Sequence, residues 1–214
     1  MAADYFCVSC RTPFQNHFPL DEHGVCRLCR SGMREFDAVY CFGWYEGVLR
    51  ELIHLFKYGR MQPLSKTLSA HLLSALPLDQ GFDVVVPMPL HWRRQWQRGF
   101  NQSGLLARAV AMRRGLEVAH AVRRTRATAT QAGLSHAGRR ANVARAFRVR
   151  KPRAIEGRRV LLVDDVITTG ATASACAAAL KRAGAKSVTV LALARVDRRF
   201  IEPGNNDSPS QEVS

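Results

Sequence analysis

The segment VLLVDDVITTGAT, residues 160–172, constrains the fold of this chain more than any other feature. It opens with a continuous apolar run, which is typical of a strand buried on both faces of a parallel sheet. Two carboxylates follow, Asp164 and Asp165, and a turn of small and hydroxyl-bearing residues then leads into an alanine-rich helix. This succession is typical of an open α/β sheet, in which ligands bind beyond the carboxyl ends of the strands.

The turn after the two acids has the chemistry of a phosphate site. It consists of Thr168, Thr169, Gly170, Ala171 and Thr172. Small residues let backbone N–H groups approach a phosphate, hydroxyls add donors, and the start of a helix adds partial positive charge. The two acids are able to accept hydrogen bonds from a sugar diol or to hold Mg²⁺ through water. We therefore predict a site for a ribose 5-phosphate.

Other interpretations of this segment lead to different functions. The acids and threonines would also suit a plain turn that caps the helix, and this alternative stays open. A Walker A loop is excluded because the chain has no GxxxxGK[ST] motif. A receiver-type phospho-acceptor domain would need more chain than the 49 residues that follow Asp165.

Strand and helix patterns alternate along most of the chain. Apolar runs predict strands, and helical spacing of apolar residues predicts helices. The expected strands are 38–44, 82–86, 160–164 and 187–194, and the expected helices are 48–57, 64–76, 102–114 and 171–183. Segment 123–145 lacks apolar periodicity and is expected to be a long mobile loop. The pattern predicts an α/β domain with a mostly parallel sheet flanked by helices.

Four cysteines near the N-terminus form two CxxC pairs. Cys7, Cys10, Cys26 and Cys29 have the spacing of a zinc ribbon, in which two tight turns each supply two thiolates. Two disulfides are the alternative, which a reducing compartment disfavours. Four thiolates leave no open coordination position, so we expect a structural zinc ion. We divide the chain into a zinc ribbon over residues 1–35, an α/β domain over residues 36–200 and a disordered tail over residues 201–214.

The positive charge of the chain is concentrated in its middle. The net charge is +15, and residues 90–160 alone carry +16, from 17 arginines and Lys151 against two glutamates. Such a field attracts phosphates or single-stranded DNA, although a solvated basic surface would have the same composition. No apolar run approaches the roughly 18 residues of a membrane span, and the N-terminus is unlike a signal peptide. A cytoplasmic location is expected.

Taken together, these motifs resemble a known family. Residues 160–172 resemble the phosphoribosyl-pyrophosphate signature of the type I phosphoribosyltransferases. With the four cysteines, PMPLHWRRQWQRGFNQSGLLA (87–107) and QAGLSHAGRRANVARAF (131–147), the chain to about residue 197 resembles the ComF (GntX-like) family. Met88 departs from the family pattern, in which valine is commoner. The resemblance implies a type I phosphoribosyltransferase fold with a small N-terminal zinc ribbon.

The resemblance also implies roles for individual residues. Asp164 and Asp165 would engage the ribose hydroxyls of phosphoribosyl pyrophosphate at the reaction centre, and residues 168–172 would wrap its 5-phosphate. The position of the pyrophosphate loop is matched by Pro87, Met88, Pro89 and Leu90. The cations expected to neutralise pyrophosphate, unless they are solvated helix residues, are Arg93, Arg94 and Arg98. Lys57 is a further candidate for an anion contact, and Asn101 suits either the motif or a helix N-cap.

Segment 123–145 corresponds in position to the flexible lid of such enzymes. Its matching residues include Arg126, Gln131, Arg139 and Arg140, with Leu134 and Asn142. A lid that closes would exclude water from a reactive sugar centre, and its arginines would neutralise the departing charge. The alternative is a basic disordered loop.

Two functional hypotheses follow. The first is a Mg²⁺-dependent phosphoribosyltransferase whose acceptor the sequence does not identify. The second is a non-catalytic protein that binds single-stranded DNA or serves as an adaptor. The family resemblance implies a role in competence, DNA uptake or DNA utilisation, with a DNA-translocating helicase and recombination mediator proteins as partners.

Overall fold

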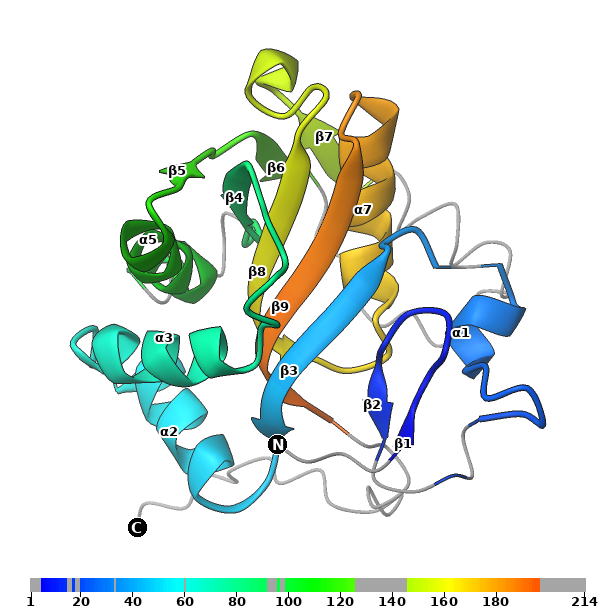
Figure 1. Ribbon diagram of the computed structural model, residues 1–214. Helices are drawn as coiled ribbons and strands as arrows, with labels where there is room; N and C mark the ends of the chain where they lie inside the picture. Colours follow the sequence, from blue (N-terminus) through cyan, green and yellow to red (C-terminus); the bar gives the residue numbers. More distant parts are fainter. Residues whose placement is uncertain are drawn as a thin grey trace, which may run out of the picture.

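The computed structural model describes residues 5–14, 17, 20–32, 34–59, 61–91, 96, 99–125 and 146–196. Its centre is a parallel five-stranded sheet (Figure 1). The strand order is β3 (Ala38–Trp44), β9 (Ser187–Arg195), β8 (Arg159–Ile167), β4 (Val84–Pro87) and β5 (Glu117–Val118). The predicted α/β fold with a mostly parallel sheet is confirmed.

Helices cover both faces of this sheet (Figure 1). On one face α7 (Ala171–Arg182) packs against inward-facing residues such as Val84, Val160 and Val190. The opposite face is covered by α2 (Gly47–Tyr58), α3 (Leu64–Ser74) and α5 (Gln102–Arg114). There the buried sheet residues are the alternate ones, including Val85 and Leu161. Burial on both faces explains why these strands are continuous apolar runs.

The cysteine-rich segment packs beside the sheet and shares its core. It contains the short antiparallel pair β1 (Tyr5–Phe6) and β2 (Pro13–Phe14), followed by α1 (Arg27–Arg30). The side chains of Cys7, Cys10 and Cys26 belong to the same buried cluster as the α7 face of the sheet. The N–H group of Val39 in β3 donates to the carbonyl oxygen of Cys10, at 2.9 Å.

A second antiparallel pair lies where only a loop was expected. Strand β6 (Val122–Arg124) pairs with β7 (Phe147–Val149), so the predicted loop 123–145 begins inside a strand. The prediction was wrong at this edge because a basic three-residue strand has no apolar pattern. A 3₁₀ turn, η1 (Pro152–Ala154), follows β7.

Strand β8 is longer than the predicted strand 160–164. It continues through the two acids to Ile167, because β9 pairs with it as far as Arg195. The other predicted elements agree with the structure to within about two residues at each end. Residues 201–214 lie outside the described part of the chain. Among the described helices, none combines the length and the apolar character that crossing a membrane requires.

Candidate functional site

Asp164 lies at the carboxyl end of the central strand β8 and is held by two donors. Its Oδ1 accepts hydrogen bonds from Ser103 Oγ at 3.1 Å and from the N–H group of Asp165 at 2.9 Å. Burial, followed by the neighbouring carboxylate of Asp165, raises the pKa of Asp164 to about 7. Ser103 comes from α5, so this helix fixes the orientation of the acid.

Asp165 forms an ion pair with a lysine from a helix that lies far away in the sequence. Lys57 Nζ lies 3.0 Å from Asp165 Oδ2, and the two side chains are only 14% and 13% exposed. The other carboxylate oxygen accepts from the N–H group of Val166 at 2.7 Å. Lys57 belongs to the last turn of α2, and its Nζ is 6.0 Å from the centre of the Tyr45 ring. A positive charge therefore stands beside the acid pair.

The turn from β8 into α7 is open to solvent and begins a 12-residue helix. Thr168 and Thr169 are exposed, and the N–H group of Ala171 donates to Thr169 Oγ1 at 3.3 Å. Gly170 has φ +79, and a Cβ there would lie 3.1 Å from Leu28 Cδ2. This position requires glycine because the left-handed backbone and the close side chain both disfavour a larger residue.

The loop after β4 is held against the end of β8. The N–H group of Met88 donates to the carbonyl oxygen of Val163 at 2.8 Å. Asn101 Nδ2 donates to the carbonyl oxygen of Met88 at 3.1 Å. Asn101 stands at the N-cap position of α5 but makes no capping hydrogen bond with its side chain. Asn101 is therefore the N-cap residue of α5, as one of the two interpretations held, while its side chain supports loop 87–90.

These elements enclose a cavity of about 310 Å³. The sequence-predicted residues that line it are Asp164, Asp165, Thr168, Gly170, Thr172, Met88, Pro89 and Leu90. Tyr45, Lys57 and Arg124 also line it. Thr169 and Ala171 are exposed on the same turn outside the lining, and Pro87 lines a neighbouring cavity. Oxygen donors from two carboxylates fit the ligand preference of Mg²⁺, so Asp164 and Asp165 are the residues that would hold it.

Several predicted site residues lie outside the described part of the chain. They are Arg93, Arg94 and Arg98 after loop 87–90, and Arg126, Gln131, Arg139 and Arg140 of the predicted lid. Their roles stay predictions. Lys57 was expected to contact an anion, and in the structure its partner is Asp165. Ser103 and Arg124 were not predicted, because only the folded chain brings α5 and β6 to the end of β8.

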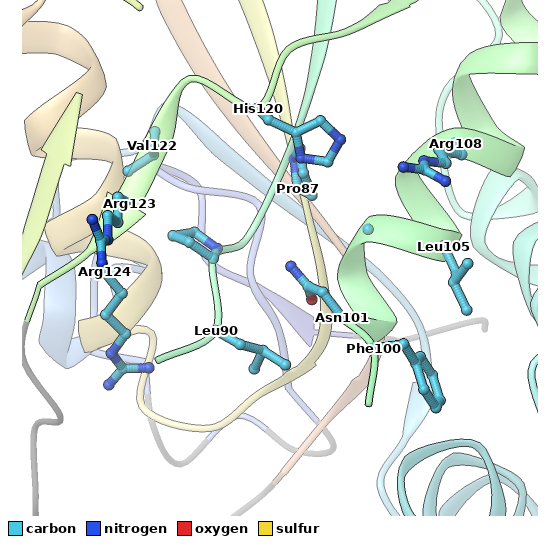
Figure 2. Close-up of a pocket in the computed structure, with 12 residues that line it drawn as sticks. Pro87, Leu90, Phe100, Asn101, Leu105, Arg108, His120, Val122, Arg123 and Arg124 are labelled. Atoms are coloured by element: carbon cyan, nitrogen blue, oxygen red, sulfur yellow. The ribbon is translucent and has the colours of Figure 1, made fainter. Parts of the chain in front are cut away.

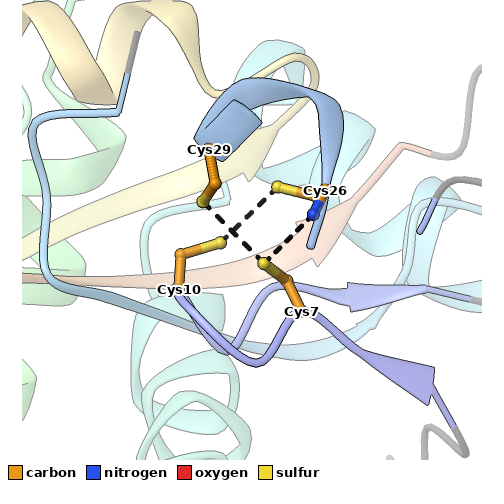
Figure 3. Close-up of side chains that lie close together, drawn as sticks. All are labelled: Cys7, Cys10, Cys26 and Cys29. Atoms are coloured by element: carbon orange, nitrogen blue, oxygen red, sulfur yellow. Dashed lines mark hydrogen bonds between the residues drawn. The ribbon is translucent and has the colours of Figure 1, made fainter. Parts of the chain in front are cut away.

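The four cysteines fit a tetrahedral metal site (Figure 3). The Sγ atoms of Cys7 and Cys29 are 3.8 Å apart, as are those of Cys10 and Cys26. Thiolates about 2.3 Å from a tetrahedral zinc ion are separated by about 3.8 Å. The N–H group of Cys26 donates to Cys7 Sγ at 3.3 Å. All four are free cysteines, so the alternative of two disulfides is not supported.

Comparison with known proteins decides the family. The family model for the phosphoribosyl transferase domain matches residues 98–211, more than half of the chain. The chain belongs to this family. The matched residues include the acid pair and the turn that follows it, from Asp164 to Thr172. Lys57 and loop 87–90 precede the matched residues in the sequence.

Two relatives agree with the ComF resemblance. DNA utilization protein YhgH of Escherichia coli (strain K12) is 37% identical over 202 residues, which cover 88% of this chain and 83% of the relative. Competence protein F of Haemophilus influenzae is 34% identical over 185 residues, covering 79% and 78%. The resemblance of this phosphoribosyl transferase family member to ComF proteins is confirmed.

Solved structures of the same kind are similar at lower identity. An adenine phosphoribosyltransferase from Thermoanaerobacter pseudethanolicus is 20% identical, covers 66% of this chain and 81% of its own, and has a TM-score of 0.38. A glutamine phosphoribosylpyrophosphate amidotransferase from B. subtilis is 25% identical, with coverages of 60% and 26% and a TM-score of 0.44.

Proposed function

We propose that this chain binds phosphoribosyl pyrophosphate with Mg²⁺ in the 310 Å³ cavity and transfers its phosphoribosyl group to an acceptor. The observation that carries the proposal is the meeting of three features in one cavity. These features are the acid pair Asp164 and Asp165, the hydroxyl-rich turn at the start of α7, and the loop 87–90. The nature of the acceptor, a nucleobase or an amine, is left open.

Each group in the cavity would meet one part of the substrate. The ribose hydroxyls would donate to the carboxylates of Asp164 and Asp165. Backbone N–H groups of residues 168–172 would donate to the 5-phosphate, which would lie at the positive end of α7. Lys57 and Arg124 would offset negative charge, and loop 87–90 would face the pyrophosphate. Mg²⁺, when bound, would neutralise charge that develops on the leaving pyrophosphate.

The transfer itself requires little proton chemistry from the protein. The acceptor lone pair forms a bond to C1 of the ribose while the C1–O bond breaks. Pyrophosphate departs with the electron pair, and the acceptor nitrogen releases a proton. Positioning and charge compensation are then the main contributions of the site. Arg93, Arg94 and Arg98 would assist the leaving group, and Arg126, Gln131, Arg139 and Arg140 would close over it as a lid.

The binding proposal is tested by calorimetric titration of phosphoribosyl pyrophosphate with Mg²⁺ present. The double variant Asp164→Asn/Asp165→Asn removes both carboxyl groups that would accept from the diol, so its affinity should fall at least ~10-fold. Asp83→Asn is the matched control, because Asp83 pairs with Arg159 at the opposite end of β8. Undiminished affinity in the double variant would falsify the site assignment.

The names of the relatives support a role linked to DNA uptake or utilisation. In that setting we propose a cytoplasmic location, where cysteines stay reduced and available to zinc. A DNA-translocating helicase and recombination mediator proteins would be partners.

The alternative function is a non-catalytic protein that binds single-stranded DNA or serves as an adaptor. The exposed Arg108 and Arg123 favour it. A screen in which no nucleobase or amine released pyrophosphate would support it further.

A further inference from the structure

A second and larger cavity lies beside the first. It measures about 410 Å³, which is within the range of small-molecule sites. The two cavities share only Pro89, Leu90 and Arg124, so loop 87–90 stands between them. The second cavity is bounded by α5, by the residues just before it, and by the segment His120–Arg124 (Figure 2). Neither Asp164 nor Asp165 lines it.

The charged side chains around this second cavity are three arginines, accompanied by one histidine. Arg108 lies on one side, Arg123 and Arg124 on the opposite side, and His120 between them (Figure 2). No carboxylate belongs to the described lining. Among the ion pairs found in the described segments, none involves Arg108, Arg123 or His120. Burial, then Arg108 and Lys151, lowers the pKa of His120, which is consistent with an uncompensated positive field.

The rest of the wall is apolar and contains one buried polar acceptor. The apolar side chains include Leu90, Phe100, Leu105 and Val122. Asn101 Oδ1 is buried and has no hydrogen-bond partner among the described residues. Its Nδ2 donates a hydrogen bond to the carbonyl oxygen of Met88. A flat apolar ring with an attached anion matches the combination of apolar wall and cations. A bare sugar phosphate would leave the apolar wall without a partner.

From these observations we infer that the second cavity binds a nucleoside 5′-monophosphate unit. The exposed side chains of Arg108 and Arg123 hold its phosphate between the two sides of the cavity, and the base lies against the apolar wall near Asn101. The unit is either a free nucleotide or the 5′-phosphorylated end of a DNA strand, since both present the same chemistry. The site does not use the acid pair, so it can be tested apart from the proposed transfer, although the two cavities share Pro89, Leu90 and Arg124.

Deoxyadenosine monophosphate is the probe that distinguishes this site from the first cavity. Its sugar lacks the vicinal diol that Asp164 and Asp165 would recognise. We expect it to bind the wild-type chain in a titration and to bind Asp164→Asn/Asp165→Asn equally well. Deoxyadenosine, which has no phosphate, should bind at least 10-fold more weakly. Binding of the monophosphate that is lost in the acid-pair variant would place it in the first cavity and overturn the inference.

Arginine variants locate the site. Arg108→Gln/Arg123→Gln should weaken binding of deoxyadenosine monophosphate at least 10-fold. Arg113→Gln is the matched control, because Arg113 is an exposed arginine on α5 that does not line the cavity. Both variants change exposed side chains, so circular dichroism should show an unchanged fold. No detectable binding by the folded wild-type chain, or equal binding by the double variant, would overturn the inference.

A short oligodeoxynucleotide with and without a 5′-phosphate identifies the source of the unit. Tighter binding of the phosphorylated strand than of the mononucleotide, lost in Arg108→Gln/Arg123→Gln, supports a strand end. Equal or weaker binding of the strand, with mononucleotide binding retained, supports the free nucleotide. Strand binding that depends on neither the 5′-phosphate nor these arginines, without mononucleotide binding, contradicts both.

Discussion

At the scale of single residues, the charge balance of the first cavity depends on Lys57. Two adjacent carboxylates would repel an anionic substrate, and the ion pair between Lys57 and Asp165 offsets one of them. Both partners are mostly buried, so water screens the pair much less than it screens the surface pairs. Asp164 has no such cation at hydrogen-bond distance among the described residues, and burial raises its pKa to about 7.

Replacing this lysine should weaken substrate binding. In Lys57→Met, the cation beside Asp165 is lost, and the cavity becomes less positive toward phosphoribosyl pyrophosphate. Loss of a charged partner costs about 1.5–3 kcal/mol, or about a 10- to 100-fold rise in Kd by calorimetry. Lys181→Met is the control, because Lys181 pairs with Asp37 outside the cavity, at 2.7 Å. Tighter binding in Lys57→Met would show that the lysine competes with the substrate for Asp165.

At the scale of elements, the turn before α7 depends on what lies behind it. Gly170 combines a left-handed backbone with close approach to Leu28 of α1 and to Phe36. The cysteine-rich segment is therefore the support on which the predicted phosphate loop rests. A second contact reinforces it, in which the N–H group of Glu35 donates to Ser174 Oγ in the first turn of α7 at 2.9 Å.

A methyl group at this turn should reduce both stability and binding. Gly170→Ala adds left-handed strain of about 1–2 kcal/mol and pushes against Leu28. Displacement of the loop should weaken phosphoribosyl pyrophosphate binding ~10-fold, measured by titration beside the thermal midpoint. Gly157→Ala is the control, since Gly157 has φ +67 with no atom within 4 Å of the added carbon. Gly157→Ala should lose similar stability while its affinity for phosphoribosyl pyrophosphate stays unchanged. If Gly170→Ala and Gly157→Ala bound phosphoribosyl pyrophosphate equally well, the proposed role of the loop would be contradicted.

The sequence predicted those elements whose pattern is local. Apolar runs and helical spacing located the strands 38–44 and 187–194 and the helix 102–114 correctly. The pair β6 and β7 was missed because its strands are short, basic and separated by the segment 125–146. The acid pair and the turn are adjacent in sequence, so their joint position was predictable. Ser103 and Arg124 reach the cavity only through tertiary packing, and no local pattern indicates that.

At the scale of the whole molecule, the cysteine-rich segment and the sheet form one buried cluster. The side chains of Cys7, Cys10 and Cys26 are buried in the same hydrophobic core as residues of β8 and α7. Asp37, which follows the cysteine-rich segment in the sequence, contacts the sheet and α7. Its carboxylate accepts a hydrogen bond from the N–H group of Val188 and forms an ion pair with Lys181 of α7. A metal that orders the four cysteines would therefore also affect the domain that carries the cavity.

Removal of zinc should therefore act on the predicted substrate site as well as on the ribbon. We expect about one zinc ion per chain by atomic absorption, since four thiolates complete one tetrahedron. Cys29→Ser or a strong chelator should lower the thermal midpoint, because metal binding contributes folding free energy. Affinity for phosphoribosyl pyrophosphate should fall together with the thermal midpoint, because Leu28 loses its fixed position behind Gly170.

Cys176→Ala is the control for zinc content, because Cys176 lies within α7, outside the four-cysteine cluster. A chain that keeps its midpoint and its affinity after complete loss of zinc would show that the ribbon and the cavity are independent.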